Sequence, residues 1–244
     1  MRCGAPPRRG GLGAERPERV WAALGPSGLV LRGGLNFAAD EPRPPGPDGQ
    51  PAAAVLLIGN AGAGYWSVFT RWRDRQDPPP ADPLDRWSRA VLERAAAAIG
   101  ARVLMPNDRP FAPFQQWAMR AEGLKPSPLG VLMHPRFGLW HAFRGALLLD
   151  CPLAPAALQR LNAAAGAPHP CDSCADRPCL RACPVAAYGP GGFDPAACKT
   201  HLRRPEGAGC GASGCLARNA CPEGVAWRYP AVVQRFHQRA FLDG

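Results

Sequence analysis

The most constraining feature of this sequence is a concentration of cysteines between Cys171 and Cys221. Eight of the ten cysteines lie in this segment, among glycines and prolines and without the apolar periodicity of a helix or strand. So short a segment cannot bury enough apolar surface to fold by packing alone. We therefore expect inorganic groups to hold it together.

The state of these thiols depends on the compartment. Residues 1–20 have no apolar segment after their arginines, which an export signal would require, and no stretch approaches the ~20 apolar residues of a membrane helix. We expect a soluble, cytoplasmic protein without a membrane partner, whose reduced thiols bind metal instead of forming disulfides. Cys3 and Cys151 lie outside the segment and are interpreted as bystanders.

The first four cysteines have the spacing Cys171-x2-Cys174-x4-Cys179-x3-Cys183, and a proline follows the last. This pattern is close to the run C-x2-C-x2-C-x3-C-P of two-cluster bacterial ferredoxins, with a longer middle gap. Three thiolates from a tight loop can bind three corners of a cubane, while the fourth cysteine reaches the other cluster. The spacing predicts ligation of [4Fe-4S] clusters.

The remaining four cysteines have the looser spacing Cys198-x11-Cys210-x4-Cys215-x5-Cys221, again followed by a proline. They supply the further ligands that a second cubane needs. By the crossed arrangement of two-cluster ferredoxins, the last cysteine of each set belongs to the other cluster. One cluster is then assigned Cys171, Cys174, Cys179 and Cys221, and the other Cys183, Cys198, Cys210 and Cys215.

Two alternatives apply to this region. Structural zinc also uses Cys-x2-Cys turns, but zinc sites usually have two short pairs, whereas here one short pair is followed by single cysteines and two Cys-Pro steps. The clusters could also serve only to hold the fold together. The small, glycine-rich cover and the close spacing of the two sets favour electron transfer.

Charge is the only support for a nucleic-acid partner. The chain has 29 basic and 19 acidic residues, a net charge of +10, which could attract RNA or an acidic partner protein. No dense basic run interleaved with aromatics occurs, so we interpret the excess as arginine usage spread along the chain. RNA binding stays open as an alternative.

The sequence before the cysteines alternates between apolar runs and helical patterns. Residues 52–60 (AAAVLLIGN) predict a buried strand, and Asp82 with Pro83 predicts the start of a helix that ends at Gly100. The segment Gly59–Gly64 (GNAGAG) is interpreted as a loop, because it matches no phosphate-binding pattern and precedes no helix signal. Further strands and a helix are expected at Arg102–Met105, Gly130–Met133, Ala142–Leu149 and Pro155–Ala165.

These elements predict an α+β protein. We expect an α/β domain over residues 20–165 and a small domain with two clusters over residues 166–229. Residues 1–19 are expected to be flexible, and residues 230–244 to form a tail helix, since Val232, Val233 and Phe236 recur there.

The segment His134–Gly145 (HPRFGLWHAFRG) carries a resemblance. It is similar to a His-Pro-Arg-Phe-Gly-x-Trp-x-x-x-Arg-Gly segment of the cobalamin-processing CblC family. The helix start Asp82–Trp87 (DPLDRW), upstream of it, also resembles a segment of that family. The order of parts resembles epoxyqueuosine reductases, in which a corrinoid domain ends in Phe-Gly-x-Trp before two ferredoxin-type cysteine sets. Those enzymes also have an isolated cysteine among basic and hydrophobic residues between the two sets. The segment Phe193–Leu202 (FDPAACKTHL) is similar to that part of their sequence. The resemblances cover residues 80–225.

The resemblance implies a nitroreductase-like fold for the N-terminal domain and a ferredoxin-like fold for the cysteine domain. It also implies that the N-terminal domain binds a corrinoid such as cobalamin. Its site would include His134, Arg136, Phe137, Gly138 and Trp140.

For the individual residues of this segment, a role in the site and a structural role both stay open. Arg136 would line the ligand pocket or make a structural ion pair. In the first role, His134 and His141 would donate hydrogen bonds near the corrinoid, or one of them would bind its cobalt. In the second, they would be structural histidines whose hydrogen bonds are made within the protein. Phe137, Trp140 and Phe143 would form pocket wall or core.

Three hypotheses follow. In the first, the clusters pass single electrons to a corrinoid within the chain, which would make it a cobalamin-dependent or cobalamin-reducing oxidoreductase. In the second, the chain is a ferredoxin-type carrier with a cofactor-free docking domain, and it exchanges electrons with a donor or acceptor protein. In the third, it binds RNA and its clusters are structural. No motif for hydrolysis is evident, and we name no catalytic residue.

Overall fold

The structure is a computed structural model, and it describes residues 16–163 and 165–244. The chain forms two compact units. The first consists of the described residues up to Asn60, Gly64–Gly123 and Ala142–Gly166. The second consists of Ala61–Ala63, Leu124–His141 and Ala167–Gly244.

The first unit is built on a four-stranded sheet. Strands β1 (Val30–Asn36), β2 (Ala54–Ala61), β6 (His141–Leu149) and β3 (Arg102–Leu104) lie in the order β1-β2-β6-β3. The pairs β1/β2 and β3/β6 are antiparallel. Nearly every residue of β2 is buried, which explains why its sequence is a continuous apolar run instead of an alternating one.

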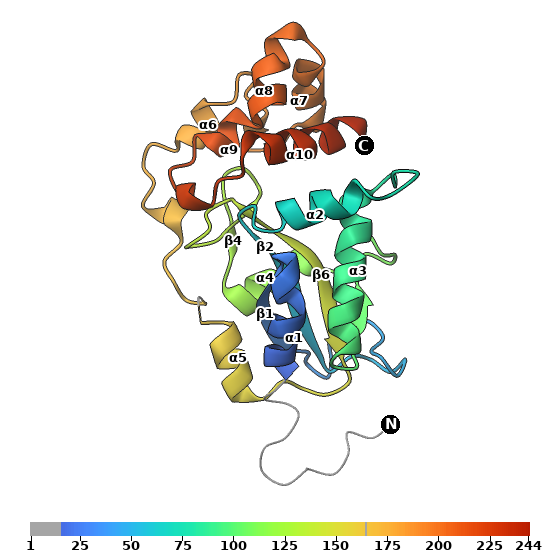
Figure 1. The fold of residues 1–244 in the computed structure, drawn as a ribbon. Helices are drawn as coiled ribbons and strands as arrows, with labels where there is room; N and C mark the ends of the chain where they lie inside the picture. The colour runs from blue at the N-terminus through green and yellow to red at the C-terminus, as the bar shows by residue number, and fades with distance from the viewer. Residues whose placement is uncertain (1–15, 164) are drawn as a thin grey trace. The chain divides into compact units, whose positions relative to one another are not determined.

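Five α-helices complete the first unit: α1 (Arg16–Leu24), α2 (Trp66–Arg73), α3 (Pro83–Ala97), α4 (Phe114–Glu122) and α5 (Pro155–Leu161). Helix α1 packs on α3 and β1, as Figure 1 shows, and α4 and α5 also pack on β1. Helix α3 has proline in its first turn, and Leu84, Trp87 and Val91 are buried at helical spacing. Asp82 precedes it but makes no side-chain capping bond.

The second unit has short elements. Its hairpins are β4 (Lys125–Pro126) with β5 (Leu132–Met133) and β7 (Tyr188–Gly189) with β8 (Gly192–Phe193). Its helices are α6 (Pro178–Arg181), α7 (Pro195–Leu202), α8 (Ala208–Ser213), α9 (Leu216–Asn219) and α10 (Ala231–Asp243), and 3-10 turns lie at Pro170–Asp172, Pro205–Gly207 and Val225–Trp227. Figure 1 shows α8 and α10, which pack on each other.

A mixed fold of helices and a small sheet agrees with the sequence prediction. The strands expected at residues 52–60, 102–105 and 142–149 correspond to β2, β3 and β6. The interpretation of Gly59–Gly64 as a loop is correct for Gly62–Gly64, which form a turn, whereas Gly59–Ala61 end β2. The expectation that no helix follows is wrong, because α2 begins at Trp66. Strand β1 and helices α1, α2 and α4 were not expected.

The division into units differs from the expected domain boundaries. Residues 61–63 and 124–141 group with the cysteine-rich region, although they lie within the expected α/β domain of residues 20–165. Helix α1 begins at Arg16, so residues 16–19 are helical, and the rest of the expected flexible segment, with Cys3, lies outside the described residues. Cys151, interpreted as a bystander, is disulfide-bonded. In the described part of the chain, every helix is too short or too polar to span a membrane.

Candidate metal centres

Four cysteines line one cavity in the second unit: Cys171, Cys174, Cys179 and Cys221. This group contains the three cysteines of a tight loop and one cysteine from far along the chain. The rest of the lining is mainly apolar and comes from Leu129, Met133, Leu139 and several prolines, with Arg177 and Glu223 as the charged residues. The structure thus brings together the four cysteines that the crossed pattern assigns to one cluster.

Short turns position these four thiols. Cys171 lies in the 3-10 turn Pro170–Asp172, and Cys179 lies in the first turn of α6. Between them the chain turns at Arg177, whose φ of 41° is in the left-handed region. A side chain in that region costs about 1–2 kcal/mol, and such strain is typically found where a site depends on the backbone direction. Cys221 follows α9 and is 6% exposed.

The pKa values show how closely the thiols are gathered. Burial and then the neighbouring Cys221, Cys179 and Cys174 raise the pKa of Cys171 to about 11. Burial also raises the pKa of Cys179 and of Cys221, against hydrogen bonds from the backbone N–H groups of Leu180 and Glu223. A group of four neighbouring thiols, of which Cys179 and Cys221 are buried, fits a positively charged metal core, because a metal binds them as thiolates and offsets their repulsion.

The second group consists of Cys183, Cys198, Cys210 and Cys215. Cys198 lies in α7, Cys210 lies in α8, and Cys215 is the residue before the first turn of α9. Burial, then Cys215, Cys183 and Cys210, raise the pKa of Cys198 to about 11. Burial, then Cys215 and Cys183, raise the pKa of Cys210, against a hydrogen bond from the backbone N–H of Leu216. These four thiols are therefore neighbours, as the crossed pattern requires.

Two further groups contact the sulfurs of the second group. The backbone N–H of Ala187 donates to Cys183 Sγ at 3.3 Å, directly after Ala186, whose φ of 47° is left-handed. The hydroxyl of Tyr188 lies 3.6 Å from Cys215 Sγ. Burial, then the Cys215 thiol, raise the pKa of Tyr188, so the phenol keeps its proton at neutral pH.

All eight of these cysteines are free. Across residues 16–163 and 165–244, no three Cys, His, Asp or Glu side chains are gathered so as to hold a metal ion. The cysteine groups therefore do not have the close arrangement of a single-ion site. The first group surrounds a cavity that other residues also line. A cubane is larger than a single ion, and its ligands stand farther apart.

The residues that the resemblance implies for a corrinoid lie in the second unit. Trp140 is fully buried, and its ring packs edge-on against Tyr229 at 5.5 Å, with the Arg218 guanidinium 4.6 Å from its centre. Arg218 also donates to the carbonyl oxygen of Leu139. These contacts make Trp140 part of the core of this unit.

The ring of Phe137 packs edge-on against Trp227 at 4.8 Å, and the Arg136 guanidinium lies 5.2 Å from the same indole. Sequence reasoning did not single out Trp227, Tyr229 or Arg218. The signal available in the sequence was the pair of aromatic residues, Trp227 and Tyr229, that follows Cys221 and Pro222 closely. The HPRFGLW segment carries the aromatic residues against which they pack.

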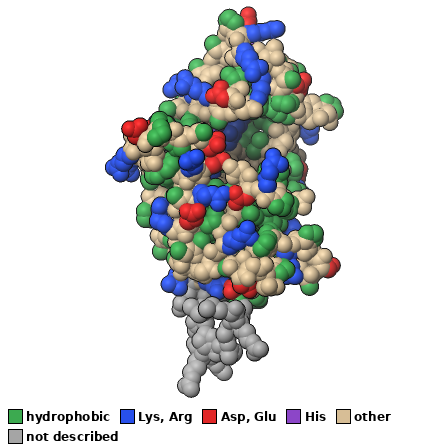
Figure 2. Space-filling model, turned by 90° about the vertical axis from the view of Figure 1, so that its right-hand side faces the viewer, with side chains coloured by type: hydrophobic (Ala, Val, Ile, Leu, Met, Phe, Trp, Pro, Cys, Tyr) green, Lys and Arg blue, Asp and Glu red, His purple; other side chains and the backbone are tan. Residues whose placement is uncertain are grey.

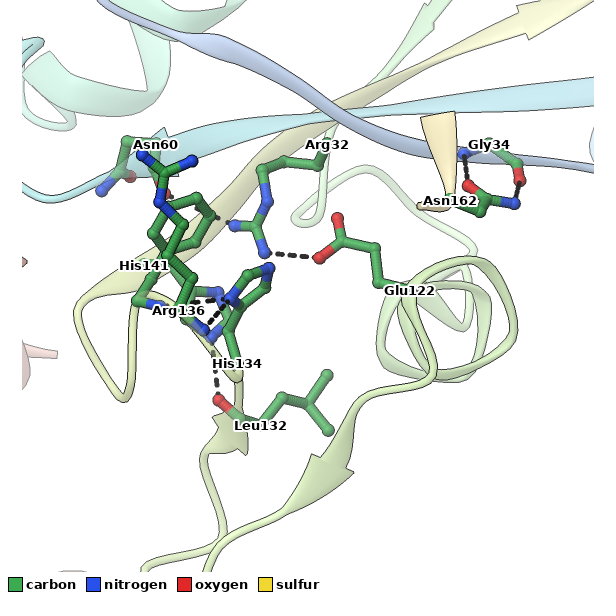
Figure 3. Close-up of polar contacts among 10 residues, drawn as sticks. Arg32, Gly34, Asn60, Glu122, Leu132, His134, Arg136, His141 and Asn162 are labelled. Atoms are coloured by element: carbon green, nitrogen blue, oxygen red, sulfur yellow. Dashed lines mark hydrogen bonds and ion pairs between the residues drawn. The ribbon is translucent and has the colours of Figure 1, made fainter. Parts of the chain in front are cut away.

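Both histidines of the segment hold backbone groups (Figure 3). His134 is 6% exposed, and its Nδ1 accepts from the backbone N–H groups of Arg136 at 2.9 Å and Phe137 at 3.1 Å. His141 is also buried, and its Nε2 lies 2.9 Å from the carbonyl oxygen of Leu132. The Nδ1 of His134 therefore carries no proton, and the ring fixes the turn that contains Arg136 and Phe137.

A scan of protein-family models gave no match to this chain, and a search of curated proteins gave none either.

Proposed function

We propose that this chain is an iron–sulfur redox protein that passes single electrons through two [4Fe-4S] clusters. The observation that carries the proposal is the sorting of eight free cysteines into two groups of four, each made of cysteines from separate parts of the sequence. The first cluster would be held by Cys171, Cys174, Cys179 and Cys221, and the second by Cys183, Cys198, Cys210 and Cys215. Bound clusters would supply one-electron reduction and oxidation.

The surroundings of the thiols support a redox role. The first group lies beside Leu129, Met133 and Leu139, and backbone N–H groups point at several sulfurs of both groups. Burial and hydrogen bonds to sulfur are the means by which a protein sets the reduction potential of such clusters.

Reduction of the loaded protein tests this role. Anaerobic titration with dithionite should bleach the broad visible absorption and take up about two electrons per chain, because each cubane exchanges one. Zinc in the same cysteines would give no visible absorption and no electron uptake. Clusters that resist reduction over the whole range reached by dithionite would contradict electron transfer and leave a structural role.

The electron acceptor is the second part of the proposal. The corrinoid implied by the resemblance stays a prediction. Two residues expected to bind it, Phe137 and Trp140, pack their rings against Trp227 and Tyr229. That engagement supports a carrier that exchanges electrons with another protein. Titration with cob(II)alamin separates the two: a spectral change that Arg136→Ala removes supports the corrinoid, and an unchanged spectrum supports the carrier.

The charge distribution supports a protein partner more than RNA. On the face drawn in Figure 2, Lys and Arg side chains are interspersed with acidic and apolar ones instead of forming a continuous basic stripe. Nucleic-acid sites usually gather their basic residues along one surface. Tight RNA binding that resists raised salt would overturn this interpretation.

A further inference from the structure

The hydroxyl of Tyr188 lies beside a proposed ligand, and the function above does not use it. It lies 3.6 Å from Cys215 Sγ, within the range of a hydrogen bond to sulfur. Tyr188 stands in β7, directly after Ala187, whose N–H donates to Cys183 Sγ. Two consecutive residues therefore present donors to two cysteines of the second group.

The position of the phenol is fixed by packing. Tyr188 pairs with Phe193 across the β7/β8 hairpin, and their rings stack with centres 4.9 Å apart and planes 24° from parallel. Phe193 in turn packs against Phe241 of α10 at 5.9 Å. Because Phe193 stacks on the ring of Tyr188, a phenylalanine at position 188 can keep this stacking.

The direction of the hydrogen bond follows from the chemistry of ligation. In a metal-free pair either the phenol or the thiol could donate. A cysteine that binds iron has lost its proton and can only accept. The O–H of Tyr188 is then the donor, and its bond becomes stronger as the cluster gains an electron, because the extra negative charge is shared with the thiolate sulfur.

We propose that Tyr188 donates a hydrogen bond to the Cys215 thiolate and thereby raises the reduction potential of the cluster held by Cys183, Cys198, Cys210 and Cys215. This inference rests on the proposed function. It makes Tyr188 a positioning and tuning residue for one cluster, and it predicts that the two clusters respond differently to its loss.

The test compares anaerobically purified, cluster-loaded wild type with Tyr188→Phe. Redox titration followed by electron paramagnetic resonance should show one of the two potentials lowered and the other unchanged. We expect the equilibrium constant for reduction to fall about tenfold, which for one electron is about 59 mV. Thermal unfolding should be unchanged, since the ring packing is kept.

Tyr229→Phe is the matched control. Tyr229 is a buried tyrosine of the same unit, and its ring packs on Trp140. Removing its hydroxyl should leave both potentials in place. If Tyr188→Phe moves neither potential, or moves both equally, the inference about Tyr188 is wrong while the clusters stand. A wild type without iron and sulfide would overturn the proposed function and the inference together.

Discussion

Gly138 and Gly224 lie so close together that neither position has room for a side chain. A Cβ atom at Gly138 would stand 2.3 Å from the carbonyl oxygen of Glu223, and one at Gly224 would stand 2.4 Å from the carbonyl carbon of Phe137. The turn of the HPRFGLW segment is thus seated directly against the chain that follows Cys221 and Pro222. This contact joins the predicted ligand segment to the cysteine-rich region within one unit.

Gly138→Ala should destabilise the second unit by more than the cost of its backbone conformation. Gly130 is the matched control, because its φ of 74° is also left-handed but nothing lies within 4 Å of its Cβ position. We expect Gly130→Ala to lower the free energy of unfolding by about 1 kcal/mol and Gly138→Ala by clearly more, as measured in urea under anaerobic conditions. Equal losses in the two variants would show that the close contact is not present in solution.

Replacing Cys183 and Cys221, the two cysteines of the cysteine-rich segment that precede a proline, tests the crossed assignment. Cys221→Ala should destroy the cluster that also uses Cys171, Cys174 and Cys179, and Cys183→Ala should destroy the other. Each variant should keep about half of the iron. Potentiometry with the Tyr188→Phe change in each background identifies the surviving cluster, since only the one with Cys215 responds. If Tyr188→Phe shifts one potential of the otherwise unchanged protein, but not that of the cluster kept by Cys221→Ala, the assignment is reversed.

In the first unit, Arg32 and Glu122 form an ion pair at 2.6 Å, and each side chain is only 3% exposed (Figure 3). Arg32→Met would leave the carboxylate buried without this partner, so we expect a loss of roughly 3–5 kcal/mol in unfolding free energy at neutral pH. Arg120→Met is the control. Arg120 lies on α4, as Glu122 does, but it pairs with Glu41 at the surface, so its loss should change the unfolding free energy little. Similar losses for both variants would contradict this account.

The same variant should show a characteristic pH dependence. Burial raises the pKa of Glu122 above 4.5, and Arg32 opposes that rise by its charge and its hydrogen bond. Without Arg32 the pKa in the folded state rises further, while the unfolded value stays the same. A raised acid pKa contributes stability below the unfolded value that is lost as pH rises through the folded value. The deficit of Arg32→Met should therefore shrink from pH 8 to pH 5, and a constant deficit would contradict the burial of this carboxyl.

Much of the first unit could be predicted from its sequence, because local patterns there reflect packing. The apolar run of β2 and the spacing of Leu84, Trp87 and Val91 each point to one buried element. Strand β1 was missed because its sequence, VLRGGLN, contains two glycines and a buried arginine. Their roles depend on distant parts of the chain: Gly33 faces Ala121 and Glu122, and Arg32 pairs with Glu122.

The grouping of the cysteines could be predicted from spacing, because the two sets follow the crossed pattern of two-cluster ferredoxins. The location of the HPRFGLW segment could not. Its contacts with Trp227, Tyr229 and Gly224 are long-range packing, which no local pattern encodes. The resemblance placed this segment in the upstream domain, whereas the structure places it in the unit that holds the cysteines.

Metal and sulfide content after strictly anaerobic purification tests the central claim most directly. Two [4Fe-4S] clusters predict about eight irons and eight acid-labile sulfides per chain, with broad visible absorption that dithionite bleaches. The variant that lacks both Cys183 and Cys221 should lose nearly all of this iron. Zinc in place of iron, or no acid-labile sulfide, would contradict the account.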